Sequence, residues 1–130
     1  MSRVAVALAV LLAAYGAWVL WRRPPRRLAG ADLGVVGIRE PAIVQFTTRT
    51  CGPCRAAAPH LRDAAERAGM VYRQIDVADR PDVARRYGIR TVPTVVVTGR
   101  DGRVLRAWTV VPDHGELASA AGRVPGRASP

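Results

Sequence analysis

The sequence contains no lysine and no asparagine, and it has only two cysteines and one phenylalanine. All 20 basic residues are therefore arginines, against 10 acidic residues, which gives a formal net charge of +10. Two cysteines are too few for a small scaffold held together by several disulfides. A hydrophobic content of 49% excludes a chain that is disordered throughout. The chain of 130 residues is long enough for one folded domain.

The excess positive charge lies largely outside the segment expected to fold. Residues 1–27 contain five arginines and no acid, whereas residues 28–116 contain 13 arginines and 10 acids, a net charge of +3. The second segment has no arginine block interleaved with aromatic residues, so we expect no nucleic-acid partner. The sequence also lacks a phosphate-binding loop, a pair of catalytic carboxylates and a Ser-His-Asp order.

A long apolar run opens the chain. Val4 to Trp21 are 18 consecutive residues without charge or proline, and a helix of that length spans about 27 Å of a hydrocarbon core about 30 Å thick. Tryptophans at its end suit the headgroup level, and four arginines follow (Arg22, Arg23, Arg26 and Arg27). We predict that residues 1–27 are a transmembrane anchor with a basic stop, through which the protein contacts membrane lipid.

Two alternatives concern this anchor. Ala14-Tyr15-Gly16 could serve as the cleavage site of a signal peptide, but the apolar run continues past it into the basic stop, which favours a retained helix. Arginines are more numerous after the run than before it, where only Arg3 stands. The positive-inside rule therefore favours a single-pass protein of a bacterial-type cell membrane, with its domain on the cytoplasmic face.

The remaining pattern predicts an α/β fold. The expected strands are Ala42–Phe46, Val71–Asp76, Thr94–Thr98 and Arg103–Val110, with a hairpin turn at 99–102; the expected helices are Cys51 to about Ala68, a short helix capped by Asp79 or Asp82 and ending near Tyr87-Gly88, and Pro112-Asp113 to about Ala121. We therefore divide the chain into the anchor (1–27), a linker or lead-in (28–40), a folded domain (41–121) and a flexible tail (122–130).

Both cysteines lie in Cys51-Gly52-Pro53-Cys54, directly after the first strand and at the start of a helix. Residues three apart in a helical turn have Cβ atoms about 5–6 Å apart, close enough to form a disulfide after slight adjustment. The N–H groups and dipole of the helix N-terminus favour the thiolate of Cys51, the form that attacks disulfides. Cys54 is more shielded and suits the resolving thiol. We therefore predict a thiol–disulfide oxidoreductase whose catalytic residues are Cys51 and Cys54.

Three motifs together resemble the thioredoxin family: Ala42-Ile43-Val44-Gln45-Phe46, then Cys51-Gly52-Pro53-Cys54 with Pro59 five residues on, and Tyr87-Gly88-Ile89-Arg90-Thr91-Val92-Pro93-Thr94. The resemblance runs from about Pro41 to Ala121. It implies a thioredoxin-like fold with an abbreviated, mixed central sheet of about four strands flanked by helices. It also implies that Pro93 is a cis proline facing the dithiol, which leaves the backbone of Val92 free to pair with an extended substrate. Gly52, Pro53, Val92 and Pro93 are thus the expected substrate contacts.

The sequence departs from the family pattern at several positions. Gln45 stands where the family usually has a buried aspartate that accepts a proton for the resolving cysteine, and glutamine cannot take up that proton. Thr47 and Thr50 stand where family members carry tryptophan, and the groove glycine expected near Val110-Val111 is absent. We expect these changes to alter efficiency and partner range rather than the dithiol chemistry.

The favoured function is reduction of protein disulfides at a membrane surface, because Gly52-Pro53 is the pairing of reducing family members. A dithiol donor, either thioredoxin-reductase-like or a membrane thiol carrier, would supply the electrons. One alternative places the domain outside the cytoplasmic membrane, in disulfide or cytochrome maturation; another is a non-catalytic tethered binding module. No cofactor or metal is expected: His60 lies about 240° around the helix from Cys54, and His114 is predicted to be isolated at a solvated helix start.

Overall fold

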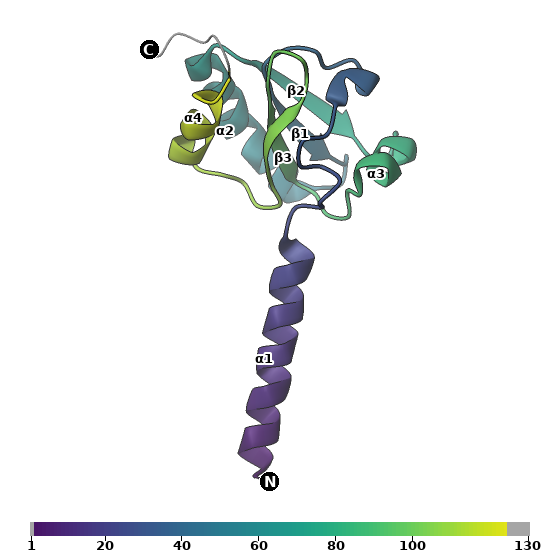
Figure 1. The fold of residues 1–130 in the computed structure, drawn as a ribbon, viewed down its shortest axis with the longest axis vertical. Coiled ribbons are helices and arrows are strands. Elements are labelled where there is room, and N and C mark those ends of the chain that lie inside the picture. Colours follow the sequence, from purple (N-terminus) through teal and green to yellow (C-terminus); the bar gives the residue numbers. More distant parts are fainter. Residues whose placement is uncertain (1, 125–130) are drawn as a thin grey trace.

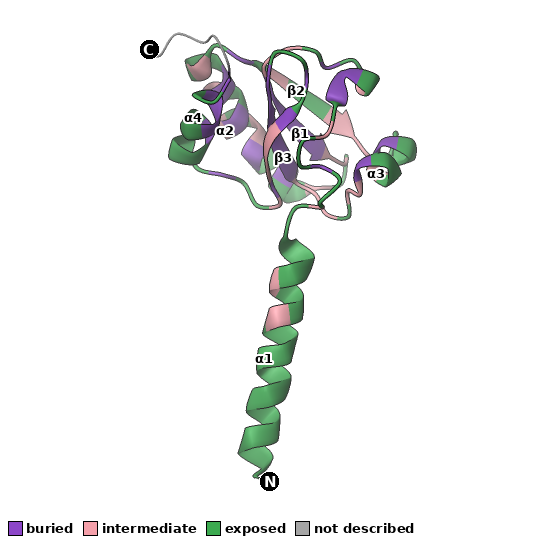
Figure 2. Ribbon diagram, viewed as in Figure 1, coloured by how far each residue is buried: buried purple, intermediate pink, exposed green. Residues whose placement is uncertain are grey.

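The computed structural model describes residues 2–124, and residues 1 and 125–130 lie outside this part. The first helix, α1 (Arg3–Arg22), extends away from a globular part (Figure 1). None of its residues is buried (Figure 2), and the hydroxyl of Ser2 caps it by accepting a hydrogen bond from the Val4 N–H at 3.1 Å. By length and composition α1 can cross a membrane, and a signal sequence near the N-terminus meets the same criteria.

The globular part is built on a four-stranded mixed sheet, as the sequence predicts. Its elements in chain order are the 3-10 helix η1 (Leu33–Val36), β1 (Ala42–Thr47), α2 (Gly52–Ala68), β2 (Val71–Asp76), α3 (Pro81–Tyr87), β3 (Thr94–Thr98), β4 (Val104–Trp108) and α4 (His114–Ala121). The strand order is β2-β1-β3-β4. β1 and β2 are parallel, whereas β1–β3 and β3–β4 are antiparallel pairs.

The strand directions bring four chain positions to one edge of the sheet. β1 and β2 both end there, at Thr47 and Asp76. β3 runs the opposite way and begins there at Thr94, and β4 returns to end there at Trp108. We call this the Thr47 edge. The turn between β3 and β4, which includes Gly102, lies at the opposite edge of the sheet.

Side chains of the central strands are buried on both faces, which explains their nearly continuous apolar sequence. Alternate residues of a strand point to opposite faces. One face, including Ile43, packs with α2 and α4; the other, including Phe46, packs with α3 and η1. Each core cluster joins residues from distant segments: the first contains Ile43, Leu61, Val95, Val97, Trp108 and Leu117, and the second Leu28, Leu33, Val44, Phe46, Val83, Tyr87 and Val96.

Residues 28–40 pack on the domain, whereas the sequence analysis describes them as a linker or lead-in. Leu28 and Leu33 are fully buried and Ile38 is 5% exposed, because these apolar side chains cover the sheet face beside α3. Gly102 makes this approach possible: its φ is 82°, and a Cβ there would lie 2.0 Å from the carbonyl oxygen of Ile38. The Tyr87 hydroxyl adds a hydrogen bond to the Asp32 carbonyl oxygen at 2.7 Å.

Two element ends, the start of α3 and the end of β4, differ from the sequence prediction. The prediction that Asp79 or Asp82 caps α3 is wrong: Arg80 is the N-cap and its side chain forms no capping bond. Asp82 lies in the first turn instead, where a hydrogen bond from Arg80 lowers its pKa. β4 ends at Trp108 rather than at Val110, because the chain leaves the sheet there and Val110 is 47% exposed.

Residues 122–124, which the sequence analysis assigns to a flexible tail, follow α4 directly and end in a buried side chain. α4 begins at His114 behind Asp113, which forms a capping box with Glu116. Beyond α4, Val124 is only 3% exposed and belongs to the core cluster with α2 and α4. The packed region therefore extends past 121, while residues 125–130 of the predicted tail lie outside the described residues.

Candidate active site

The two cysteines form a disulfide at the N-terminus of α2, with their Cα atoms 5.3 Å apart. Cys51 is the N-cap of the helix, and its Sγ accepts a hydrogen bond from the Cys54 N–H at 3.2 Å. Cys54 is 1% exposed, whereas Cys51 is partly exposed. The more accessible sulfur is thus the one at the positive end of the helix dipole, as the sequence predicts.

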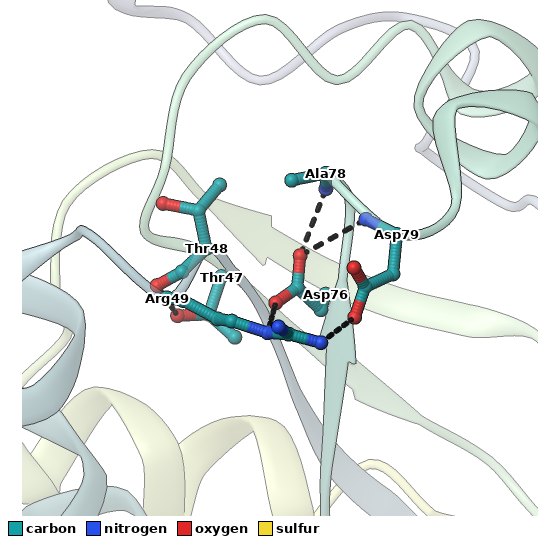
Figure 3. Close-up of polar contacts among 6 residues, drawn as sticks. All are labelled: Thr47, Thr48, Arg49, Asp76, Ala78 and Asp79. Atoms are coloured by element: carbon teal, nitrogen blue, oxygen red, sulfur yellow. Dashed lines mark hydrogen bonds and ion pairs between the residues drawn. The ribbon is translucent and has the colours of Figure 1, made fainter.

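The loop before Cys51 is attached to the end of β2 (Figure 3). The guanidinium of Arg49 lies 2.9 Å from a carboxylate oxygen of Asp79 and 3.8 Å from one of Asp76. Asp76 also accepts hydrogen bonds from the N–H groups of Ala78 and Asp79, at 2.9 and 3.2 Å. Because Arg49 is largely exposed, each ion pair contributes no more than about 1 kcal/mol. Their effect is to hold the loop between β1 and α2 against the next strand.

Pro93 lies immediately before β3, and the Val92–Pro93 peptide bond is cis, as the family resemblance implies. Thr94 pairs with Phe46 near the end of β1, so Pro93 and the cysteines lie at the same Thr47 edge. The Thr94 hydroxyl donates to the Thr91 carbonyl oxygen at 2.7 Å and closes the turn. In residues 2–124 the backbone of Val92 has no backbone hydrogen-bond partner, and both Val92 and Pro93 are partly exposed. Gly52 and Pro53 are exposed on the first turn of α2.

Gln45 is fully buried directly behind the dithiol. Its Nε2 donates to the carbonyl oxygen of Cys54 at 2.8 Å, and its Oε1 accepts from the hydroxyl of Tyr72. Gln74 donates to the Tyr72 hydroxyl at 2.8 Å and lies 3.4 Å from Gln45 Oε1. Burial raises the pKa of Tyr72, so this hydroxyl keeps its proton over a wide pH range. Buried Gln45 beside Cys54 is therefore linked by uncharged hydrogen-bonding groups, through partly buried Tyr72, to exposed Gln74.

Sequence reasoning identified Gln45 but missed Tyr72 and Gln74. In the structure, Gln45 and Gln74 are direct partners in the parallel β1–β2 register. Tyr72 lies two residues before Gln74 and so faces the same side of the sheet. Without the register, however, the sequence does not indicate which strand residues approach Gln45.

The two histidines lie together, so the prediction that His114 is isolated is wrong. The ring centroids of His60 and His114 are 4.3 Å apart in an edge-to-face arrangement. His60 Nε2 lies 2.8 Å from the Pro112 carbonyl oxygen, and His114 Nε2 lies 3.8 Å from Asp63. The pair joins α2 to the start of α4. Across residues 2–124, no three His, Cys, Asp or Glu side chains are arranged to hold a metal ion.

A mixed four-stranded sheet, a Cys-X-X-Cys disulfide at a helix N-terminus and a proline at the same sheet edge define the class of thioredoxin-fold dithiol proteins. The family model described as "Thioredoxin" matches residues 34–120, most of the globular part. The chain belongs to the thioredoxin family.

Individual relatives agree with this assignment. The chain is 38% identical over 68 residues to the chloroplastic thioredoxin M5 of Oryza sativa subsp. japonica, covering 51% of this chain and 40% of the relative. It is 32% identical over 80 residues to a thioredoxin of Pyropia yezoensis, covering 60% of this chain and 75% of the relative. The solved structure of a mutant thioredoxin from Halobacterium salinarum NRC-1 superposes with a TM-score of 0.61 at 25% identity, covering 74% of this chain and 84% of that one.

The matched region is shorter than several of these relatives. The alignments span 40% of the rice chloroplastic thioredoxin and 51% of the mitochondrial thioredoxin of Bos taurus. The shared part includes the sheet and the dithiol, whereas α1 lies outside the residues that the family model matches.

Proposed function

We propose that this protein is a membrane-anchored thiol–disulfide oxidoreductase that reduces disulfides in other proteins. The observation that carries the proposal is the disulfide between partly exposed Cys51, the N-cap of α2, and buried Cys54. This arrangement gives one sulfur access to a substrate and keeps the other within bonding distance behind it. Membership of the thioredoxin family supports the same chemistry.

The reaction begins from the reduced dithiol. The Cys51 thiolate attacks one sulfur of a substrate disulfide, that bond breaks, and the other substrate sulfur leaves as a thiolate that takes up a proton. The Cys54 thiolate then attacks Cys51 Sγ, forms the Cys51–Cys54 disulfide and releases the second substrate thiolate. Two electrons pass to the substrate, and a dithiol donor returns them to the protein. Gly52-Pro53 between the cysteines supports this reducing direction.

Substrate binding is assigned to the surface around the two sulfurs. Gly52 and Pro53 are exposed between the two cysteines, and Val92 and Pro93 lie at the same sheet edge. The unpaired backbone of Val92 can add an extended substrate segment by backbone hydrogen bonds, as strands do at a free sheet edge.

A trapping experiment tests the dithiol assignment. In Cys54→Ser the resolving thiol is missing, so mixed disulfides with substrate proteins should accumulate on Cys51 and should disappear on reduction. Cys51→Ser is the matched control and should trap little, because the remaining thiol is buried. Equal trapping by both variants, or none by Cys54→Ser in a folded protein, would contradict the assignment.

The location of the domain is a separate part of the proposal. We assign α1 as a retained membrane anchor and the domain to the cytoplasmic face, since four arginines follow its apolar run and one precedes that run. In intact cells, a membrane-impermeant maleimide should leave reduced Cys51 unlabelled, whereas a permeant one should label it. Labelling by both reagents would place the domain outside and favour a role in disulfide or cytochrome maturation.

A further inference from the structure

We propose that the dithiol faces the membrane, so that its substrate is a disulfide close to the lipid headgroups in a protein held in the same membrane. This inference rests on the proposed membrane anchoring and deepens it. The observations that carry it are the places where the chain leaving α1 contacts the globular part.

The first contact joins the end of α1 to the Thr47 edge. The Thr109 hydroxyl donates a hydrogen bond to the carbonyl oxygen of Arg22, the last residue of α1. Thr109 directly follows Trp108, where β4 ends at this edge. Figure 1 shows α1 leaving the globular part at the end opposite the β3–β4 turn. The anchor and the dithiol are therefore on the same side of the domain.

A second contact fixes the segment after α1. A methyl group at Gly88 would lie 3.3 Å from Cβ of Pro25, so the proline rests on the C-terminus of α3. Gly88 precedes Pro93 by five residues in the loop that leads to the Thr47 edge. The chain then enters the core at Leu28, which is fully buried. Residues 23–27, which we call the tether, thus follow the surface beside the candidate site before the chain becomes part of the fold.

The tether is too short to present the opposite edge to the membrane. Even fully extended, the chain from Arg22 to Leu28 reaches about 22 Å at most, and Pro24-Pro25 restricts it further. A domain of this size is about 30 Å across. The Thr47 edge therefore stays near the bilayer, and the β3–β4 turn and η1 stay distant from it.

Side chains near the anchor suit a lipid surface. Val110 and Val111, which follow Thr109, are 47% and 38% exposed. Arginines within and next to the tether are exposed as well (Arg22, Arg23, Arg26 and Arg27). Cationic side chains attract anionic headgroups, at about 1 kcal/mol for each residue near the surface, and exposed apolar side chains favour the interface. A folded soluble protein would have to enter the narrow space between this edge and the bilayer, whereas a membrane-held partner presents its disulfide there directly.

The orientation can be measured with two matched labelling sites. In a Cys51→Ser/Cys54→Ser background, Val110→Cys and Val35→Cys place a fluorescent label at similarly exposed valines, 47% and 56% exposed, at opposite edges. The full chain is reconstituted in vesicles of phosphatidylcholine and phosphatidylglycerol that carry nitroxide headgroups. We expect the label at Val110→Cys to be quenched at least about threefold more strongly than the label at Val35→Cys. Equal quenching, or stronger quenching at Val35→Cys, would overturn the orientation.

The substrate class is tested with the intact dithiol in the same vesicles. Two transmembrane peptides carry the same disulfide, one next to the headgroups and one raised on a rigid helical spacer of about 30 Å. The native chain should reduce the first peptide at least about tenfold faster. A variant with the same spacer inserted between Arg23 and Pro24 should lose or reverse this preference. Equal rates for the native chain, or an unchanged preference in the spacer variant, would overturn the assignment.

Failure of this inference is distinguishable from failure of the proposed function. If the chain does not float with vesicles, the anchor itself is wrong and the inference falls with it. If the chain floats but both labels are quenched equally, only the orientation is wrong. If Cys54→Ser traps no substrate although the labels report the expected orientation, the dithiol function is wrong instead.

Discussion

Gln45 is the residue at which this chain differs most consequentially from its family pattern. Its amide donates a hydrogen bond to the Cys54 carbonyl oxygen and accepts one from the Tyr72 hydroxyl. The amide neither gains nor loses a proton in the ordinary pH range. In the proposed mechanism, Cys54 would therefore release its proton to water or to the leaving substrate thiolate.

Replacing this amide with an acid should create a titration that the native protein lacks. The rate of disulfide reduction by the native chain is expected to follow the ionisation of the thiols alone. In Gln45→Asp a buried carboxylate, whose proton is retained to higher pH by desolvation, should add a second inflection to the pH–rate profile. Gln45→Leu serves as the uncharged control. The same second inflection in the native protein or in Gln45→Leu would show that another group accepts the proton.

Tyr72 allows a stability prediction with a defined pH dependence. Tyr72→Phe removes the hydroxyl that bonds Gln45 and Gln74, so the free energy of unfolding at pH 7 should fall by about 1 kcal/mol. Burial raises the pKa of Tyr72, so the neutral hydroxyl stabilises the folded state fully below the unfolded-state pKa of about 10. That stabilisation is lost as the pH rises through the higher folded-state pKa. Urea titrations should show the gap between native and variant narrowing in strong alkali; a widening gap would contradict this assignment.

Sequence patterns identified residues whose role depends on their neighbours along the chain. They missed residues whose role depends on how two strands pair. Cys51 and Cys54 are recognisable because only two residues separate them, at the junction between a strand and a helix. Gln45 was recognisable because it stands where the resembled family usually has a buried aspartate. Its partner Tyr72 was not, because that contact requires knowing that β1 and β2 pair in parallel.

Among the elements, the β3–β4 turn packs closely against the segment before β1. At Gly102 the φ is 82°, and a methyl group there would lie 2.0 Å from the Ile38 carbonyl oxygen, which leaves no room for a side chain. Gly99, at the other end of the turn, would place its methyl group 3.5 Å from its nearest neighbour, an ordinary contact.

These two glycines should therefore respond very differently to substitution. Gly102→Ala should lower the free energy of unfolding by at least about 2 kcal/mol, because the backbone must shift to relieve the clash. Gly99→Ala is expected to change it by less than about 1 kcal/mol. Thermal or urea unfolding of both variants measures the difference. Similar stabilities would mean that residues 28–40 do not pack against the turn as described.

Element types were predictable where the apolar pattern was strong, and element ends were not. β1 and β3 are nearly uninterrupted apolar runs, and both occur as expected. The start of α3 was misassigned because two aspartates resembled caps, whereas Pro81 at the first helical position makes Arg80 the cap. The contact between His60 and His114 follows from the packing of α4 on α2, which no local pattern specifies.

For the whole molecule, the largest departure from the sequence analysis is the segment between anchor and domain. The sequence analysis assigns residues 28–40 to a linker or lead-in, yet Leu28 and Leu33 are core residues. Helix α1 is consequently joined to the fold by a few residues at the Thr47 edge. That short attachment turns a general prediction, a domain near a membrane, into a specific one about which edge faces the lipid.

The central claim is that the Cys51–Cys54 pair exchanges its two electrons with a disulfide in another protein. A single-turnover experiment tests it most directly: the fully reduced chain in vesicles is mixed with a membrane-held disulfide protein, quenched with an alkylating agent and analysed by mass spectrometry. The account predicts that one substrate disulfide disappears for each Cys51–Cys54 disulfide formed, and that Cys51→Ser converts none. A substrate that stays oxidised while both cysteines remain free thiols would contradict the account.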